Sequence, residues 1–123
     1  MKKFFSDRLK SFLPAFEGIH YLIRNEGNAI IHLIATVIVL ILSIMLKITS
    51  SEWVLIILAI TLVWFAELIN TALEKITDII QPELHPKAKI IKDLAASAVL
   101  ITAIFSVIIG LLILGPKIYQ LIN

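Results

Sequence analysis

The chain has 123 residues, 59% of them hydrophobic, and a mean hydropathy of +0.99, well above the apolar share of a soluble domain. Its net charge is only +2, and lysines that orient a chain against anionic lipid account for this excess better than nucleic-acid binding does. No cysteine is present, which excludes disulfides, thiolate catalysis and cysteine-bound metal centres. The sequence therefore predicts an all-α integral membrane protein with a single domain over residues 1–123, in which any active site must be built on the membrane helices.

The first predicted element is an amphipathic helix over about residues 5–23. Apolar residues recur there at alternating spacings of four and three, and charged residues occupy the other faces. A helix of this kind is expected to lie on the bilayer surface. Pro14 falls inside the pattern, so we expect a kink or a break at that position.

Three apolar stretches follow, over about residues 29–46, 53–72 and 94–114. Each approaches the roughly 20 residues that a helix needs to cross a hydrocarbon core about 30 Å thick, once the polar end of the second is included. The segment KITSSE predicts a short turn after the first stretch, and QPELHPKAK, with two prolines, predicts a longer loop after the second. The sequence thus predicts three transmembrane helices.

Lysines and arginines are unevenly divided between the two ends of these spans. Only Lys47 and Lys117 of the 11 lie on one side, and the other nine precede the first span or surround the second loop. This asymmetry predicts a cytoplasmic N-terminus and a C-terminus outside. The charged residues that the topology brings to the cytoplasmic boundary are Glu26, Glu74, Asp78, Lys92 and Asp93.

The segment FAELINTALEKITD, residues 65–78, carries a polar stripe on the second span. At 100° per residue its polar side chains share a face about 100° wide. They are Glu67, Asn70, Thr71, Glu74 and Asp78. Glu67 is the deepest of them, and Glu74 lies about 10 Å nearer the cytoplasm. We expect a single three-helix chain to be too small to shield this stripe alone.

A carboxylate at the depth of Glu67 costs at least about 2.5 kcal/mol by insertion scales, so function is the first hypothesis for it. One alternative is a buried carboxylate held by Asn70 or by a neighbouring helix for packing specificity. Another is an intramembrane proton or cation site in a small oligomeric transporter. A third is a non-catalytic membrane scaffold that binds neither nucleotide nor ions.

Glu26 and Glu74 are candidate ligands of one divalent cation, because Mg²⁺ is usually held by one or two carboxylates together with substrate phosphates. Lys92 and Asp93 place a cation suited to a phosphate beside an acid, although such a pair also serves to anchor and cap a helix. For Glu74, the ordinary charge of a helix leaving the membrane is an alternative explanation.

The three histidines receive different interpretations. His85 lies in the cytoplasmic loop among prolines and lysines, where an anionic ligand and a solvated side chain are equally good explanations. His20 and His32 are interpreted as interface or packing residues.

No Walker A pattern, dinucleotide fingerprint or kinase catalytic-loop motif is present in the sequence. The chain instead resembles the bacterial diacylglycerol kinase family of small integral-membrane lipid kinases, which includes the undecaprenol kinases of Gram-positive bacteria. ELINTALE, residues 67–74, matches the family pattern E-x-x-N-[ST]-A-x-E, and Asp78 and the KD of residues 92–93 follow at the family spacing. RNEGNAIIH matches the region of the first metal-binding glutamate, and HPKAKIIKDLAASAV is similar to the Gram-positive branch. The resemblance covers about residues 10–114.

This resemblance implies transfer of the γ-phosphoryl group of ATP to the hydroxyl of a membrane lipid, with Mg²⁺, by a homotrimer in the bacterial cytoplasmic membrane. By matched position, Glu67 is the general base, Asn70 a positioning residue, and Glu26 and Glu74 the metal-linked carboxylates. The residues at nucleotide-contacting positions are Glu83, Leu84, His85, Lys92 and Asp93, with Arg8 at the approximate position of the family's N-terminal arginine. The lipid is undecaprenol or diacylglycerol, and the Gram-positive-like loop favours undecaprenol.

Overall fold

Helices make up almost all of the computed structural model, which describes residues 10–123. Those that lie wholly in this range are α2 (Leu13–Asn25), α3 (Gly27–Met45), α4 (Ser50–Ile80) and α5 (Pro86–Ile122), and the range contains no β-strand. The predicted all-α fold is therefore confirmed. Arg8 and the first residues of the predicted surface helix lie outside the described range.

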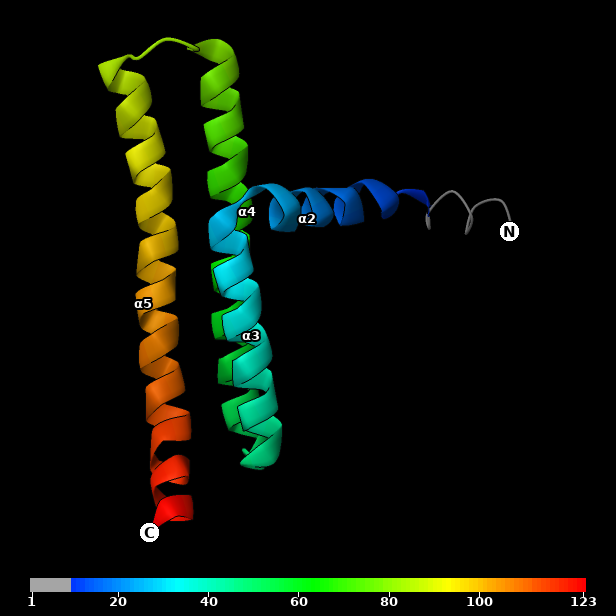
Figure 1. Ribbon diagram of the computed structural model, residues 1–123, viewed down its shortest axis with the longest axis vertical. Helices are drawn as coiled ribbons and strands as arrows, with labels where there is room; N and C mark the ends of the chain where they lie inside the picture. The colour runs from blue at the N-terminus through cyan, green and yellow to red at the C-terminus, as the bar shows by residue number, and fades with distance from the viewer. Residues whose placement is uncertain (1–9) are drawn as a thin grey trace.

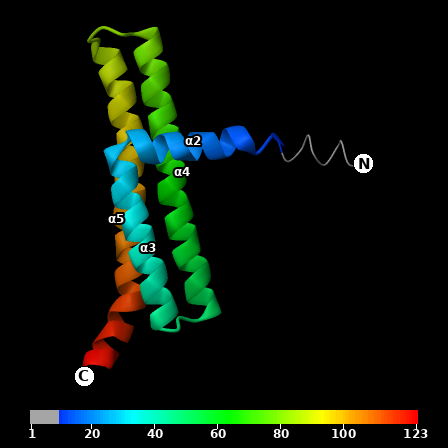
Figure 2. The ribbon, with the colours of Figure 1, turned by 45° about the vertical axis from the view of Figure 1, so that its right-hand side comes forward.

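α2 runs across the direction of the other three helices (Figures 1 and 2). It begins after a turn at residues 11 and 12, with Pro14 in its first turn, where a missing N–H costs no intrahelical hydrogen bond. The predicted interruption at Pro14 thus marks the beginning of α2. Its direction is the one expected of a helix on the bilayer surface. A single extended residue, Glu26 (φ −113°, ψ 117°), separates α2 from α3.

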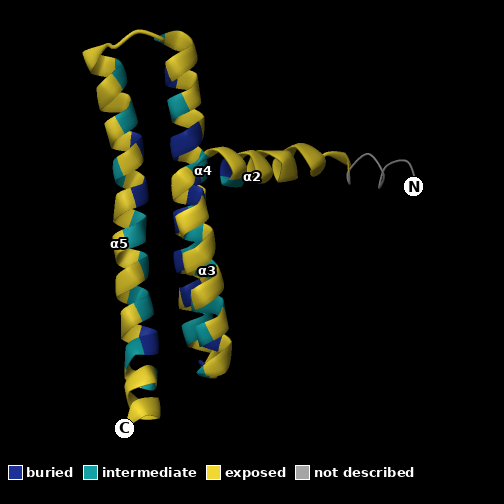
Figure 3. Cartoon of the chain, viewed as in Figure 1, coloured by how far each residue is buried: buried dark blue, intermediate teal, exposed yellow. Residues whose placement is uncertain are grey.

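α3, α4 and α5 are all long and apolar enough to cross a membrane, so the predicted number of spans is confirmed. Their 19, 31 and 37 residues correspond to about 28, 46 and 55 Å of helix. Because a hydrocarbon core is about 30 Å thick, α4 and α5 are longer than a membrane requires. Their outward faces are largely exposed in the single chain, as lipid-facing surfaces are expected to be (Figure 3).

α4 is the central helix, with α5 packed along it and α3 packed against it as well (Figures 1 and 2). Trp64 Nε1 in α4 donates a hydrogen bond to Thr36 Oγ1 in α3, at 3.0 Å. Ser106 Oγ in α5 donates to the carbonyl oxygen of Ala59 in α4, at 3.1 Å. Both neighbours are therefore tied to α4 by polar contacts at membrane depth.

The end of α3 forms a tight C-terminal cap around Lys47, whose φ of 49° lies in the left-handed region. The N–H of Ile48 donates to the carbonyl of Ser43 at 3.3 Å, and the N–H of Lys47 donates to that of Ile44 at 3.2 Å. This pair of bonds is the Schellman arrangement, which usually has glycine at the left-handed position. Ile48 then turns inward and joins a buried cluster with Ile56 and residues of α5.

The beginning of α4 is fixed by a capping box. The Thr49 hydroxyl accepts a hydrogen bond from the N–H of Glu52 at 3.3 Å, and the Glu52 carboxylate accepts one from the N–H of Thr49 at 2.6 Å. Glu52 also lies 3.2 Å from the ammonium of Lys117 in α5. The predicted short turn between the first two spans is therefore compact, with one cap at the end of α3 and another at the beginning of α4.

Two prolines bracket the connection between α4 and α5, as the sequence predicts. Pro82 follows the C-cap of α4, and Pro86 occupies the first turn of α5. His85 is the N-cap of α5, and its Nδ1 accepts a hydrogen bond from the N–H of Lys87 at 3.2 Å. Since α5 begins at Pro86, Lys92 and Asp93 lie in its second turn and do not cap it. The capping alternative for that pair is wrong.

Candidate functional site

The polar stripe of α4 runs from a buried end to an exposed end. Glu67, Asn70 and Thr71 are only 2%, 7% and 7% exposed, whereas Glu74 is half-buried and Asp78 is exposed. This gradient follows the depth order predicted from the sequence. The expectation that a single chain cannot shield the stripe is wrong for its deep end, because α3 and α5 both pack against α4.

Glu67 faces His32 of α3. The distance between His32 Nε2 and Glu67 Oε2 is 3.7 Å, and the histidine side chain is itself only 16% exposed. Glu67 Oε2 accepts no hydrogen bond from any described residue, although it is buried. The interpretation of His32 as a packing residue therefore missed a polar contact with the most buried carboxylate of the stripe.

A second cluster forms where α2 joins α3. The ammonium of Lys75 in α4 lies 3.4 Å from the carboxylate of Glu26 and 5.9 Å from the ring centroid of Tyr21 in α2. Both contacts are favourable for a cation. They place the junction of α2 and α3 beside Lys75 on α4, two turns from Glu67 toward the end of α4.

Carboxylates gather around this junction. Glu26 and Glu74 both lie close enough to Glu67 for their charges to act on it. In the part of the chain that the structure describes, no three acidic or histidine side chains lie close enough to hold one ion. Two carboxylates are nevertheless the usual protein contribution to a Mg²⁺ site that substrate phosphates complete. The donor chemistry of Glu26 and Glu74 therefore fits a hard divalent cation.

The charged pair of α5 is engaged in ion pairs. Lys92 pairs with Asp78 of α4, and Asp93 pairs with Lys89 one turn earlier on α5. The contact with Asp78 agrees with the predicted shared depth of these residues. Both side chains of the α4–α5 pair remain partly exposed, so the pair is accessible from water.

Glu83 and Leu84 lie at the tip between α4 and α5, beside His85, and both are fully on the surface. Along the axis of α4, the last residue of the helix lies about 9 Å beyond Glu74. Along the axis of α5, Lys92 lies about 10 Å from His85. The candidate nucleotide-contacting residues of the described range thus form two groups. Glu83, Leu84 and His85 lie at the tip, and Lys92 and Asp93 lie further along α5. The structure does not bring the tip into contact with Glu67.

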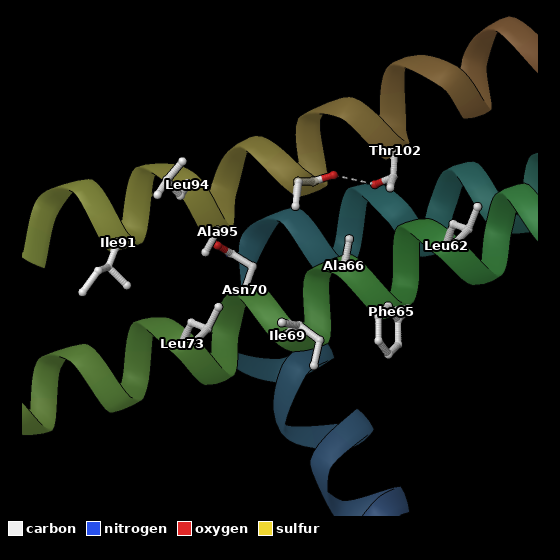
Figure 4. Close-up of a pocket in the computed structure, with 11 residues that line it drawn as sticks. Leu62, Phe65, Ala66, Ile69, Asn70, Leu73, Ile91, Leu94, Ala95 and Thr102 are labelled. Carbon is white, nitrogen blue, oxygen red and sulfur yellow. Dashed lines mark hydrogen bonds between the residues drawn. The ribbon is translucent and has the colours of Figure 1, made fainter.

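An apolar groove of about 480 Å³ lies between α4 and α5 (Figure 4). Leucine, isoleucine, alanine and phenylalanine side chains form most of its lining, and its polar residues are Asn70 and Thr102. The Asn70 side chain reaches toward Ala95 of α5, and its Oδ1 accepts no hydrogen bond from a described residue. The groove therefore offers a surface suited to hydrocarbon, with a buried and unpaired polar atom behind its lining.

The chain is similar to known proteins over most of its length. Residues 14–114 match the family described as prokaryotic diacylglycerol kinase. The chain is 44% identical to an undecaprenol kinase of Bacillus subtilis over 108 residues, which is 88% of each protein. It is 37% identical to a diacylglycerol kinase of Synechocystis over 114 residues, 92% of this chain and 65% of that protein. A diacylglycerol kinase of Helicobacter pylori is 50% identical over 54 residues, 44% of this chain and 42% of that protein.

Proposed function

The chain belongs to the prokaryotic diacylglycerol kinase family, and from this membership we propose that it transfers the γ-phosphoryl group of ATP to the hydroxyl of a membrane lipid alcohol. It is an integral membrane protein and a lipid kinase. The observation that carries the assignment of the site is the burial of Glu67 at membrane depth, on the same helix face as the water-side Glu74. No similarity favours the alternative of a transporter or a scaffold.

Glu67 is proposed as the general base. Because Glu67 is only 2% exposed in the single chain, the lipid hydroxyl would have to reach it by entering between the helices from the bilayer. Removal of the hydroxyl proton typically contributes a factor of about 10² to 10⁴ to the rate. Asn70, which lines the groove and whose side-chain oxygen is buried and unpaired, is proposed to position the acceptor. Phosphoryl transfer otherwise depends mainly on positioning and charge neutralisation.

Glu26 and Glu74 are proposed to hold Mg²⁺. When bound, such an ion would neutralise negative charge on the phosphates of the nucleotide. Glu26 is held by Lys75 in the structure, so Lys75 is positioned to compensate this carboxylate when no cation is bound. The resemblance assigns nucleotide contacts to the tip residues Glu83, Leu84 and His85, to Lys92 and Asp93 on α5, and to Arg8.

Undecaprenol is the acceptor that we favour, with diacylglycerol as the second candidate. Both present a primary hydroxyl to the interface, and the apolar lining of the groove between α4 and α5 is compatible with either hydrocarbon. The preference rests on the higher identity to the undecaprenol kinase and on the Gram-positive-like loop before α5.

We also infer a homotrimer in the bacterial cytoplasmic membrane, with the N-terminus in the cytoplasm. The trimer rests on family membership, and the orientation rests on the distribution of lysines and arginines. The largely exposed apolar faces of α3 and α5 leave room for contacts with other copies as well as with lipid.

A phosphorylation assay tests the proposal. Purified protein in mixed micelles is incubated with γ-labelled ATP, MgCl₂, undecaprenol and diacylglycerol, and the lipid products are separated. We expect the label to appear in a lipid phosphate, and we expect more undecaprenol than diacylglycerol to be phosphorylated. Unlabelled lipid would contradict the kinase assignment and would be the result expected of a transporter.

The base is tested in the same assay with Glu67→Gln. Because the amide cannot accept the hydroxyl proton, we expect turnover to fall by about 10² or more while MgATP binding is kept. Unchanged turnover would remove Glu67 as the base without removing the kinase assignment.

A further inference from the structure

His32 is the described side chain best placed to act on Glu67. Two carboxylates, Glu26 and Glu74, also act on Glu67, and they repel its charge. Three lysines at this end of the molecule are paired elsewhere, namely Lys75 with Glu26, Lys89 with Asp93 and Lys92 with Asp78. Lys87, in the first turn of α5, is exposed and is not among the groups that act on Glu67. Within residues 10–123, the compensating group at Glu67 is therefore a histidine from another helix.

One oxygen atom of Glu67, Oε2, is available to accept a hydrogen bond from His32. Glu67 Oε2 is buried and has no hydrogen-bond donor among the described residues, and His32 Nε2 lies 3.7 Å from it. A hydrogen bond forms at about 2.7–3.2 Å, so a small side-chain rotation closes the gap. One turn further along α3, the hydrogen bond from Trp64 to Thr36, at 3.0 Å, already holds α3 against α4. The backbone thus presents His32 to Glu67 without needing to move.

We propose that His32 is a positioning residue for Glu67: a proton on Nε2 is donated to Oε2, which fixes the carboxylate and leaves Oε1 for the lipid hydroxyl. This inference rests on the proposed role of Glu67 as base. A base acts only when its lone pair points at the proton that it removes, and a misplacement of about 1 Å can cost a factor of about 10². His32 supplies the orientation, and Glu67 accepts the proton.

The test compares two substitutions of His32 in the phosphorylation assay described above. His32→Leu keeps an apolar side chain of similar size and removes the donor, whereas His32→Gln places an amide N–H near the position of Nε2. We expect His32→Leu to lower kcat by about tenfold or more, with KM for MgATP and for the lipid changed less than about twofold. We expect His32→Gln to recover most of the lost kcat.

A double substitution identifies the residue through which His32 acts. If His32 works only by orienting Glu67, then adding His32→Leu to Glu67→Gln produces no further loss of turnover. Equal losses in the leucine and glutamine variants, or an additive loss in the double variant, would overturn the proposal. If Glu67→Gln lowers turnover and His32→Leu does not, the role of His32 fails and the role of Glu67 stands.

Thr36→Val provides the matched control on the same face of α3. It removes the acceptor of the hydrogen bond from Trp64, and Thr36 makes no hydrogen bond to Glu67 Oε2. We expect this variant to lower the thermal stability in detergent and to leave kcat unchanged. A loss of kcat like that of His32→Leu would show that any loosening of α3 against α4 is sufficient, and would contradict a specific role for His32.

Discussion

Glu74 and Asp78 lie one turn apart on the same face of α4, yet their surroundings differ. Glu74 is half-buried, whereas Asp78 is exposed and paired with Lys92. Within the described residues, no ion pair engages Glu74. A carboxylate that is partly desolvated and unpaired is better prepared to bind a cation than one whose charge is already compensated. The structure therefore favours Glu74 over Asp78 as the proposed metal ligand, and Glu26 would have to exchange its pairing with Lys75 for the ion.

The Glu74→Gln variant should consequently need more Mg²⁺. We expect the concentration giving half-maximal lipid phosphorylation to rise by about tenfold or more, because one charged ligand is lost. Titration of MgCl₂ at saturating ATP measures this shift, and Asp78→Asn is the control, with a change of less than about twofold. Superimposable Mg²⁺ titrations of Glu74→Gln and the unsubstituted chain would count against a ligand role.

At the scale of residues, the sequence predicted which side chains share a face of one helix. It did not predict the contact between side chains of two different helices. The shared face of Glu67, Asn70 and Thr71 follows from helical periodicity, and their burial agrees with it. The contact between His32 and Glu67 links positions 35 residues apart, and it depends on how α3 packs against α4. The feature of the sequence that pointed to this contact was a single histidine within an apolar span.

Among the elements, the connection from α3 to α4 carries the clearest local strain. Lys47 adopts a left-handed conformation that glycine occupies without steric cost, in a cap whose two hydrogen bonds are both made. The turn lies at the end of the molecule opposite the connection between α4 and α5 (Figures 1 and 2). Its strain therefore affects stability and is separate from the candidate site.

Replacing Lys47 with glycine should stabilise the protein. Relief of the left-handed strain is worth about 1 kcal/mol, partly offset by the greater freedom of glycine in the unfolded chain, so we expect a rise in Tm of a few degrees. Thermal unfolding in detergent measures it, with lipid phosphorylation unchanged. Lys47→Ala keeps the strain and is the control. An equal rise in Tm for the alanine variant would show that loss of the charge is the cause.

The three membrane-spanning helices of residues 10–123 and the helix-stopping prolines between α4 and α5 could be predicted from the sequence, but the lengths of α4 and α5 could not. Apolar stretches identify the part of a helix that lies in lipid, and both helices continue past it with polar turns that carry no hydropathy signal. α5 accordingly begins at Pro86, before the predicted span at about residue 94. The mistaken capping role of Lys92 and Asp93 follows from this.

For the whole molecule, the two ends of the bundle differ in their charges and connections. The tip between α4 and α5 lies at one end, and the short α3–α4 turn and the C-terminus lie toward the other (Figures 1 and 2). Lys117 and Glu52 pair at this second end. The arrangement is compatible with the topology that the lysine distribution predicts, and it provides exposed positions at both ends.

Single cysteines can test that topology because the native chain has none. Leu84 at the tip and Gln120 near the C-terminus are both exposed, so Leu84→Cys and Gln120→Cys serve as a matched pair. In intact spheroplasts we expect a membrane-impermeant maleimide to label the Gln120→Cys chain, and to label the Leu84→Cys chain only after permeabilisation. The reverse labelling pattern would invert the proposed orientation.

α4 contains neither glycine nor proline from Ser50 to Ile80, so it offers no built-in hinge between Glu67 and Glu74. The separation of about 10 Å between these two levels is a fixed length of the chain. The bilayer has no such fixed length, since its hydrocarbon thickness varies by several ångströms between membranes. A thicker or thinner bilayer moves the headgroup plane relative to Glu67 while the protein keeps its own spacing. Membrane thickness therefore becomes a variable that controls how well a lipid hydroxyl is presented to the site.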